Sequence, residues 1–306
     1  MSGTATLKRR KRMRLMVGVL ITVGLISVLS SEPWSALSAA KSVTPSGEAD
    51  LAPDGLHVIS WNIQVFGRSK ASKPQVMAHI VETLQHYDLI AIQEIRDKSQ
   101  TAIQQLLEAL NNASQHTYTM IVGERLGRSA SKEQYAYVYR VDVLTPLRFY
   151  TADDPDDVFH REPLVAHFQC PACVSPNFIV VNVHTDPDEA HEEVDALSDV
   201  VTTAIQASAI QDVLVLGDLN ADCGYMNQHE RETSPLFGDG FTMLIGDDVD
   251  TTTGKTHCAY DRLVVTNSLL PRIEHARVVA FDDDLDLDEA QTKAVSDHYP
   301  VALTLY

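Results

Sequence analysis

Short runs of β-branched and apolar residues recur along most of the chain, and turn residues separate them. Runs of this length between turn signals are typical of strands buried on one or both faces. The sequence therefore predicts strands at His57–Asn62, Leu89–Gln93, Thr117–Gly123, Tyr135–Tyr139, Leu164–Phe168, Phe178–Val183, Val213–Gly217, Leu263–Thr266 and Val301–Tyr306.

Three segments between these strands carry apolar residues at helical spacing, namely Lys73–Gln85, Thr101–Asn111 and Glu189–Ala209. A repeat of three to four residues predicts a helix with one buried face. Strands outnumber helices, and the two do not alternate strictly. This order favours packed mixed sheets with outer helices over a doubly wound parallel sheet.

The first 40 residues have the pattern of an export signal. Six Lys and Arg side chains precede the apolar run Leu15–Leu29, and Ser, Pro and Ala-rich sequence follows it. These are the three regions of a secretory signal, and the run is short for a spanning helix, which needs about 20 residues. We predict a signal peptide or uncleaved signal anchor at 1–40, a linker at 41–55, one domain at 56–306, and a secreted, extracellular or periplasmic protein.

The net charge restricts the classes of function that the chain can have. The net charge is −18, and the basic leader makes the remainder more acidic still, which argues against sequence-independent coating of nucleic acid. It is compatible with an enzyme that uses a local basic cleft or divalent cations.

Four cysteines in an exported chain predict two disulfides. Cys170 and Cys173 have redox-motif spacing but lie in a Pro-rich turn between strands, so we predict a structural disulfide there, which leaves Cys223 with Cys258.

Polar residues interrupt the apolar runs where five of the predicted strands begin or end. They are Asn62, Glu94, His184, Asp218 with Asn220, and Asp297 with His298. Any one of them alone is more simply explained as a turn former, a helix cap or a structural hydrogen-bonding group. Strand ends of one layer lie close together, however, so the combination predicts a single site.

The residue types indicate the chemistry of that site. Carboxylate and amide oxygens suit Mg²⁺, Mn²⁺ or Ca²⁺ rather than zinc. A hard cation beside two histidines suits hydrolysis of a phosphate ester, since the metal stabilises charge on the phosphoryl oxygens while a general base activates water.

Several motifs resemble the endonuclease/exonuclease/phosphatase superfamily, namely IQE ending at Glu94, GDLN at Gly217–Asn220 and SDHYP at Ser296–Pro300. The longer segments GDLNADCGY from Gly217 and CAYDR from Cys258 are similar to the deoxyribonuclease I group. The resemblance covers about residues 56–306. It implies a four-layer αββα sandwich, with two central mixed sheets flanked by helices, and a metal-dependent endonuclease that leaves 5′-phosphate products.

The resemblance also implies roles for individual residues. The implied ligands of Mg²⁺ or Mn²⁺ are Glu94, Asn62, Asp218, Asn220 and Asp297. The implied catalytic residues are the acid–base pair His184 and His298, Glu133 and Asp261 that orient them, and Asp218. The implied DNA contacts are Arg96, Arg161, Arg128 and Asn220. DNA is the implied partner, with no stable protein partner and with membrane contact only through an uncleaved N-terminal segment.

The chain departs from the family pattern in two places. Ser131 stands where the family commonly has a tyrosine near the minor groove, and Cys170–Cys173 follows the Arg161-Glu-Pro163 segment, whereas the family's small disulfide precedes it. Calcium is a further candidate cofactor. Its candidate ligands are Asp153, Asp154, Asp156 and Asp157, or Asp250 with Thr252.

Three alternative functions share much of this pattern. A sphingomyelinase-like phospholipid phosphodiesterase would use the same metal ligands, but no exposed aromatic hairpin for membrane insertion is evident. A nuclease subunit of a secreted toxin would need partner subunits for its activity. A catalytically inactive binding module would lack Glu94 or a histidine, and both histidines and Glu94 are present.

Overall fold

The computed structural model describes residues 55–306. The predicted leader at 1–40 and nearly all of the linker at 41–55 lie outside the described residues. Within the described part of the chain, no helix is both long and apolar enough to cross a membrane.

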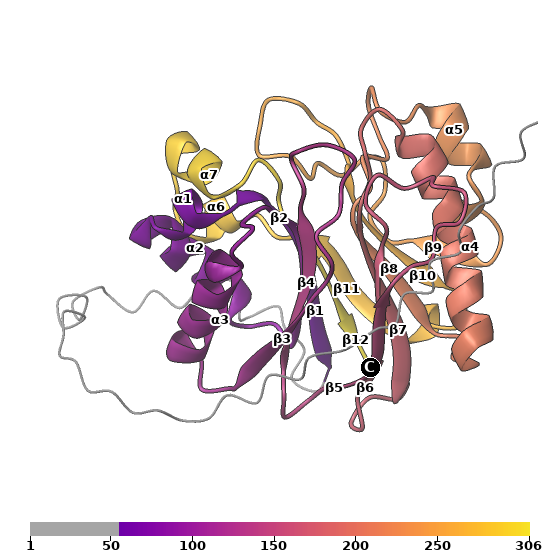
Figure 1. The fold of residues 1–306 in the computed structure, drawn as a ribbon, viewed down its shortest axis with the longest axis horizontal. Helices are drawn as coiled ribbons and strands as arrows, with labels where there is room; N and C mark the ends of the chain where they lie inside the picture. The colour runs from indigo at the N-terminus through magenta and orange to yellow at the C-terminus, as the bar shows by residue number, and fades with distance from the viewer. Residues whose placement is uncertain (1–54) are drawn as a thin grey trace, which may run out of the picture. The chain divides into compact units, whose positions relative to one another are not determined.

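Two mixed sheets of six strands each form the centre of the domain (Figure 1). The first sheet has the spatial order β11 (Ile273–Val278), β12 (Val301–Leu305), β1 (Leu56–Phe66), β2 (Leu89–Ile95), β4 (Gln134–Arg140) and β3 (Tyr118–Val122). The second has the order β5 (Thr145–Thr151), β6 (Leu164–Gln169), β7 (Asn177–His184), β8 (Val213–Asp218), β10 (Asp261–Thr266) and β9 (Phe241–Met243). Each sheet contains one parallel pair, β1 with β2 and β7 with β8, among antiparallel neighbours.

Helices cover the outer face of each sheet (Figure 1). On the side of the first sheet lie α1 (Arg68–Ala71), α2 (Pro74–Leu84), α3 (Thr101–Ala113), α6 (Phe281–Asp284) and α7 (Glu289–Val295). On the side of the second sheet lie α4 (Ala190–Ser208) and α5 (Gln228–Thr233). Short 3₁₀ turns stand at η2 (Pro235–Phe237) and η3 (Leu270–Arg272). The predicted four-layer αββα sandwich is confirmed.

Successive side chains of a strand point to opposite faces of its sheet, so each sheet can pack against the other sheet on one face and against helices on the other. In β1, Val58 faces the core between the two sheets, whereas Ile59 and Trp61 face the core beneath the helices. A third core lies between the second sheet and α4. The sheets are also joined by polar contacts, because the Tyr137 hydroxyl lies 2.9 Å from a carbonyl oxygen of β6 and 2.9 Å from one of β7 and can donate its hydrogen to either. Side chains that lie near the ends of strands in different sheets can therefore meet.

The predicted strands and the three predicted helices are present, and several further elements were not predicted. The additional strands of the described residues are β5, β9 and β11, and they lie at sheet edges and are half-buried or exposed. An edge strand needs no continuous apolar run, so it leaves a weak periodic signal. The remaining helices, α1, α5, α6 and α7, are each seven residues or fewer.

Candidate active site

The two parallel strand pairs bring polar side chains to one place between the sheets. Asn62 of β1 pairs with Gln93 of β2, and His184 of β7 pairs with Asp218 of β8. Gln93 Nε2 donates across the interface to Asn182 Oδ1 of β7 at 2.7 Å. Buried polar groups of this kind must be paired, and this contact fixes one sheet relative to the other next to the site.

The backbone at these strand ends adopts conformations that ordinary residues rarely occupy. Glu94 and Asn220 have φ values of 58° and 47°. Gly217 has φ of 140°, and a Cβ there would lie 1.9 Å from the Val183 carbonyl oxygen. The glycine of the GDLN segment is therefore required for the close approach of β7 and β8, and non-glycine residues at positive φ are concentrated at functional sites.

Two buried carboxylates from different sheets are joined by one amide. Asn62 Nδ2 lies 2.9 Å from Asp218 Oδ2 and 3.2 Å from Glu94 Oε1, and donates to both. The Asn62 oxygen accepts from the Gln64 N–H at 2.9 Å, so it does not face the carboxylates. The predicted ligand Asn62 thus serves here as a donor that holds Glu94 and Asp218 together.

Two histidines approach the same oxygen of Asp218. His184 Nε2 lies 3.4 Å and His298 Nε2 3.5 Å from Asp218 Oδ2. Each ring has a separate buried carboxylate at its other nitrogen: Glu133 Oε1 lies 3.0 Å from His184 Nδ1, and Asp261 Oδ2 lies 2.8 Å from His298 Nδ1. A carboxylate at Nδ1 fixes the orientation and tautomer of the ring and leaves Nε2 for the chemistry.

The electrostatics of the four groups agree with this geometry. Burial disfavours the imidazolium, but Glu133 and Asp218 raise the pKa of His184, and Asp261 and Asp218 raise that of His298. Burial likewise opposes ionisation of Glu133 and Asp218, but the histidines lower the pKa of both carboxyls. Groups whose environments shift their protonation this strongly are candidates for proton transfer.

The donor set fits a hard divalent cation. Glu94 and Asp218 are buried acids that Asn62 joins, and the more exposed Asp297 carboxylate lies 3.8 Å from His298 Nε2. Arg96 places its guanidinium 3.0 Å from Glu94 Oε2, so a positive charge already neutralises part of this acidic cluster. Asn220 donates through Nδ2 to the Thr185 carbonyl at 3.0 Å, which leaves its amide oxygen available as an acceptor or ligand. Oxygen donors of this kind are preferred by Mg²⁺ and Mn²⁺.

The structure gives Arg161 a different setting from the predicted DNA contact. The residue is 9% exposed, and its guanidinium donates to the His184 and Thr185 carbonyls at 3.0 and 2.9 Å. Its Nε also lies 2.6 Å from Glu133 Oε1. The Nε–Nη2 edge of the guanidinium is therefore used to hold His184, Thr185 and Glu133.

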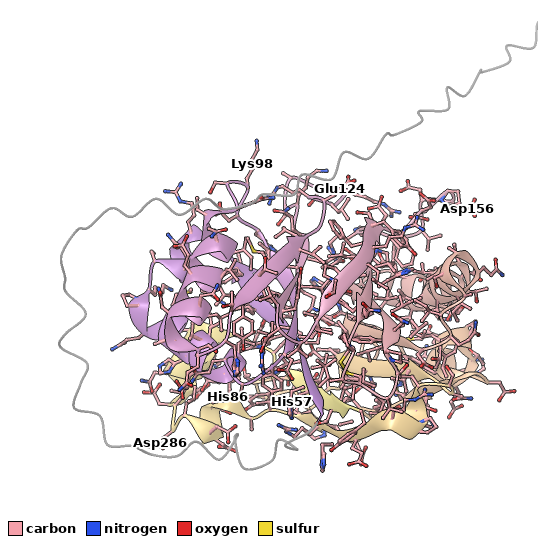
Figure 2. The ribbon with its side chains drawn as sticks, turned by 90° about the horizontal axis from the view of Figure 1, so that it is seen from below. His57, His86, Lys98, Glu124, Asp156 and Asp286 are labelled. Atoms are coloured by element: carbon pink, nitrogen blue, oxygen red, sulfur yellow. A yellow bond between two sulfur atoms is a disulfide. The ribbon has the colours of Figure 1, made fainter. Side chains whose placement is uncertain are left out.

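The other two predicted DNA-binding arginines are more accessible. Arg96 donates to the Ser131 hydroxyl at 3.0 Å, so the serine that replaces the family's tyrosine contacts an arginine of the site. Arg128 is bound to Glu189 at 3.0 Å and to Asp157. The loops that follow β2 and β3 and the loop before β6 reach one edge of the domain, which Lys98, Glu124 and Asp156 mark, whereas His57 at the start of β1 lies at the opposite edge (Figure 2).

Both predicted disulfides, Cys170–Cys173 and Cys223–Cys258, are present. The second joins the loop after Asn220 to the segment just before Asp261 and so supports the site. Two of the candidate calcium ligands are engaged within the protein: Asp154 accepts from the Val158 and Phe159 N–H groups, and Asp250 accepts from Thr252 and Cys258. Calcium binding at either place stays a prediction.

Sequence reasoning missed several residues that support the site. Tyr135 exchanges hydrogen bonds with the His184 backbone at 3.0 and 3.2 Å, and Thr251 Oγ1 accepts from the Asp261 N–H at 3.1 Å. Thr251 lies outside the predicted strands. Tyr135 begins one, but a tyrosine there continues the apolar and aromatic run rather than interrupting it, so the search for polar interruptions found neither residue.

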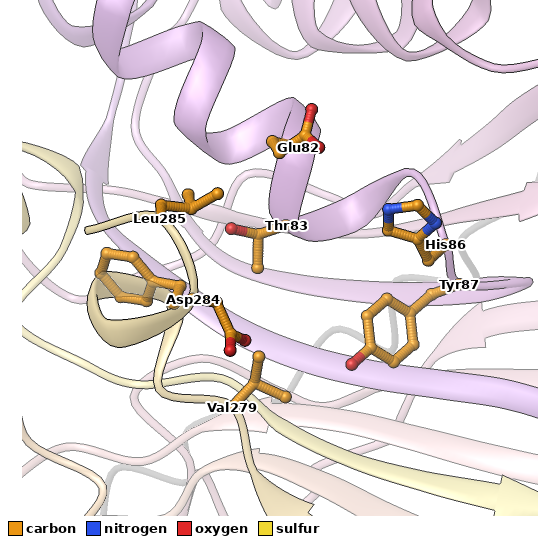
Figure 3. A pocket seen from close by; sticks show the side chains of 8 residues that line it. Glu82, Thr83, His86, Tyr87, Val279, Asp284 and Leu285 are labelled. Carbon is orange, nitrogen blue, oxygen red and sulfur yellow. The ribbon is translucent and has the colours of Figure 1, made fainter. Parts of the chain in front are cut away.

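A small cavity elsewhere shares no residue with this site (Figure 3). It lies where α2 ends and holds about 30 Å³, room for about one water molecule. Its lining residues are Glu82, Thr83, His86, Tyr87, Val279, Phe281, Asp284 and Leu285.

Comparison with known proteins identifies the family. The model of the endonuclease/exonuclease/phosphatase family matches residues 59–298. The chain belongs to this family. It is 38% identical over 276 residues to "Deoxyribonuclease-1-like 2" of Mus musculus, covering 89% of this chain and 98% of the relative. It is 38% identical over 264 residues to "Deoxyribonuclease-1" of Sus scrofa, covering 82% of this chain and 91% of the relative.

Solved structures confirm the fold. The D. rerio TDP2 structure complexed with a single-strand DNA product has a TM-score of 0.57 at 16% identity, covering 82% of this chain and 98% of that one. The human Nocturnin catalytic domain with bound sulfate has a TM-score of 0.57 at 15% identity, covering 83% of this chain and 94% of that one. At these identities the likeness concerns the fold alone.

Proposed function

We propose that the protein is a secreted endonuclease that uses a divalent cation to hydrolyse DNA phosphodiester bonds and leaves 5′-phosphate ends. The observation that carries the proposal is the convergence of two imidazole Nε2 atoms on one oxygen of Asp218, with a buried carboxylate behind each ring. The similarity to deoxyribonucleases over most of the chain supports DNA as the substrate. Two disulfides support an oxidising, extracytoplasmic location.

The chain's own residues can perform both proton transfers of the hydrolysis. One imidazole takes a proton from the attacking water while the other gives a proton to the leaving 3′ oxygen. Water oxygen then bonds to phosphorus as the phosphorus–3′-oxygen bond breaks, which leaves a 5′-phosphate and a 3′-hydroxyl. Glu133 and Asp261 keep His184 and His298 oriented, and Asp218 lies between the two rings.

We assign the cation to Glu94 as the principal ligand, with Asp218, Asn220 and Asp297 as the other candidates. When bound, the cation stabilises negative charge on the phosphoryl oxygens. Asn62 holds the carboxylates of Glu94 and Asp218 together by donating to both.

Arginines at the edge of the site provide the contacts to DNA. Arg96 is about one-third exposed and lies beside Glu94, so it can reach a phosphate next to the reacting one. Arg128 is more distant, and it would have to exchange its contacts with Glu189 and Asp157 for DNA. We assign Arg161 to the support of His184 and Glu133, with at most one edge of its guanidinium toward substrate.

Purified protein should nick supercoiled plasmid with Mg²⁺ or Mn²⁺, and EDTA should stop the reaction. His184→Ala and His298→Ala should each lower kcat about 10²- to 10⁴-fold, the usual contribution of a general acid or base. The matched control is His275→Ala, since His275 is an exposed histidine on β11. Undiminished nicking by either site variant would refute the acid–base assignment. Hydrolysis of sphingomyelin but not of plasmid DNA in parallel assays would refute the substrate class.

A further inference from the structure

Lys70 is a buried lysine on α1 that the mechanism above does not use. The residue is only 9% exposed. Its ammonium donates to the Ile63 carbonyl at 3.0 Å and to the Val295 carbonyl at 2.6 Å. Both acceptors are main-chain oxygens, so the buried charge is satisfied by two segments of backbone that lie 232 positions apart in the numbering.

These two segments carry opposite halves of the candidate site. Ile63 directly follows Asn62, and Val295 directly precedes the segment Ser296–His298. The ladder between β1 and β12 ends at the pair Ser60 and Val301, before either half is reached. Beyond that pair the two segments are held by side chains, and Lys70 is one of them.

Two further hydrogen bonds connect the end of β1 with the Ser296–His298 segment. Ser296 Oγ donates to the Asn62 carbonyl at 2.6 Å, and Trp61 Nε1 donates to the His298 carbonyl at 2.9 Å. Lys70 differs from these neutral donors because an ammonium is costly to bury. A neutral apolar side chain would avoid that cost, so its place here suggests a role besides filling space.

The turn that follows Ile63 is strained. Gln64 and Val65 have φ values of 32° and 50°, although neither is glycine and Val65 is β-branched. Such conformations cost about 1–3 kcal/mol each and persist only where the surroundings fix them. Here Lys70 holds the Ile63 carbonyl, while the Val65 N–H donates to Glu94 Oε2 at 2.7 Å. The position of a candidate metal ligand therefore depends on a turn that Lys70 anchors.

The charge of Lys70 also interacts with acidic residues of the candidate site. Burial lowers its pKa to about 8, and the nearby carboxylates of Asp297 and Glu94 counteract that effect by raising it. The ammonium thus lies within electrostatic reach of two candidate ligands, one from each half of the site.

We propose that Lys70 is a positioning residue, which holds the end of β1 and the Ser296–His298 segment in the relative placement that creates the cation site. This inference rests on the proposed function. It gives the ammonium an indirect role, through the two carbonyls, and no contact with substrate. Replacing a residue that orients metal ligands without binding the metal typically lowers metal affinity or activity 10- to 100-fold.

Calorimetry with Mn²⁺ in the absence of DNA tests the proposal without relying on turnover. We expect Lys70→Met to bind Mn²⁺ about 10- to 100-fold more weakly than wild type. Its kcat should fall while the KM for plasmid DNA changes little. Lys70→Arg, which keeps a positive charge and N–H donors at this position, should recover most of the Mn²⁺ binding. Lys293→Met is the matched control because Lys293 is exposed on α7 and pairs with Glu289, so its Mn²⁺ binding should equal that of wild type.

Each other outcome overturns a defined claim. If Lys70→Met is folded and binds Mn²⁺ as tightly as wild type, or more tightly, the positioning role is wrong. If Lys70→Met and Lys70→Arg both fail to fold by near-UV circular dichroism, Lys70 serves the stability of the domain, and the inference is again wrong. If wild type neither binds Mn²⁺ nor nicks plasmid, the proposed function itself fails.

Discussion

Glu133→Gln provides a sharp test of how the site controls its histidines. The Glu133 carboxylate is 1% exposed and lies 3.0 Å from His184 Nδ1 and 2.6 Å from Arg161 Nε. Glutamine has nearly the same shape but no charge, so the change removes an interaction between charged groups and little volume. An interaction of this kind with a buried charged group contributes about 1.5–3 kcal/mol, which corresponds to a roughly 10- to 150-fold lower kcat/KM if it acts in the transition state.

The pH dependence distinguishes an electrostatic role from simple damage. Glu133 is the first of the charges that raise the pKa of His184 against the effect of burial. Without it, His184 should lose its proton at lower pH. The limb of the profile of kcat/KM against pH that reports His184 should therefore move to lower pH, whether the ring acts as the acid or as the base.

Plasmid nicking measured across pH, with thermal unfolding as a check on folding, provides the assay. Glu124→Gln is the control, since Glu124 is an exposed residue after β3 in the loop that leads to Glu133. Wild-type activity in Glu133→Gln, or reduced activity with an unmoved pH profile, would contradict the assigned role.

Two further predictions concern stability. Replacing Cys223 and Cys258 by serine should lower the free energy of unfolding by about 4 kcal/mol, and replacing Cys170 and Cys173 should lower it by about 2 kcal/mol. The first bridge costs more to lose because it closes a loop of 35 residues, whereas the second closes one of 3. Denaturant unfolding of both variants checks this order, and a larger loss for the short loop would contradict it. Burial raises the pKa of Glu193 from 4.5 to about 7, although hydrogen bonds from the backbone N–H groups of His160 and Asp186 partly oppose this shift. The folded state therefore keeps a proton that the unfolded state releases, so this group stabilises the fold most below pH 4.5 and progressively less as the pH rises to 7. Between pH 5 and pH 8, the free energy of unfolding of wild type should fall by about 2.5 kcal/mol relative to that of Glu193→Gln. If the difference in the free energy of unfolding between the two proteins does not change with pH, Glu193 does not titrate in this way.

The sequence was most informative where polar residues interrupt buried strands. A carboxylate or imidazole at the end of an apolar run is costly to bury, and Glu94, His184 and Asp218 are indeed gathered around one centre. The order of apolar runs and helical segments also predicted packed mixed sheets with outer helices, whereas the four-layer arrangement was predicted only through the family resemblance.

The direction in which a side chain points was much less predictable. The motif around Arg161 gives its place along the chain, but only the packing of β7 shows that its guanidinium faces the His184 carbonyl. The amide of Asn62 likewise donates where it was expected to ligate. Lys70 was overlooked because its acceptors are backbone oxygens, which have no sequence signature.

The division of the site between the two sheets has a consequence for folding. His184 and Asp218 end strands of the second sheet, whereas Glu94 belongs to the first and His298 stands just before its strand β12. A partly folded chain in which each sheet has formed separately would hold near-complete secondary structure and no complete site. Recovery of nicking during refolding should therefore lag behind the recovery of far-ultraviolet ellipticity, and it would report the moment at which the sheets dock.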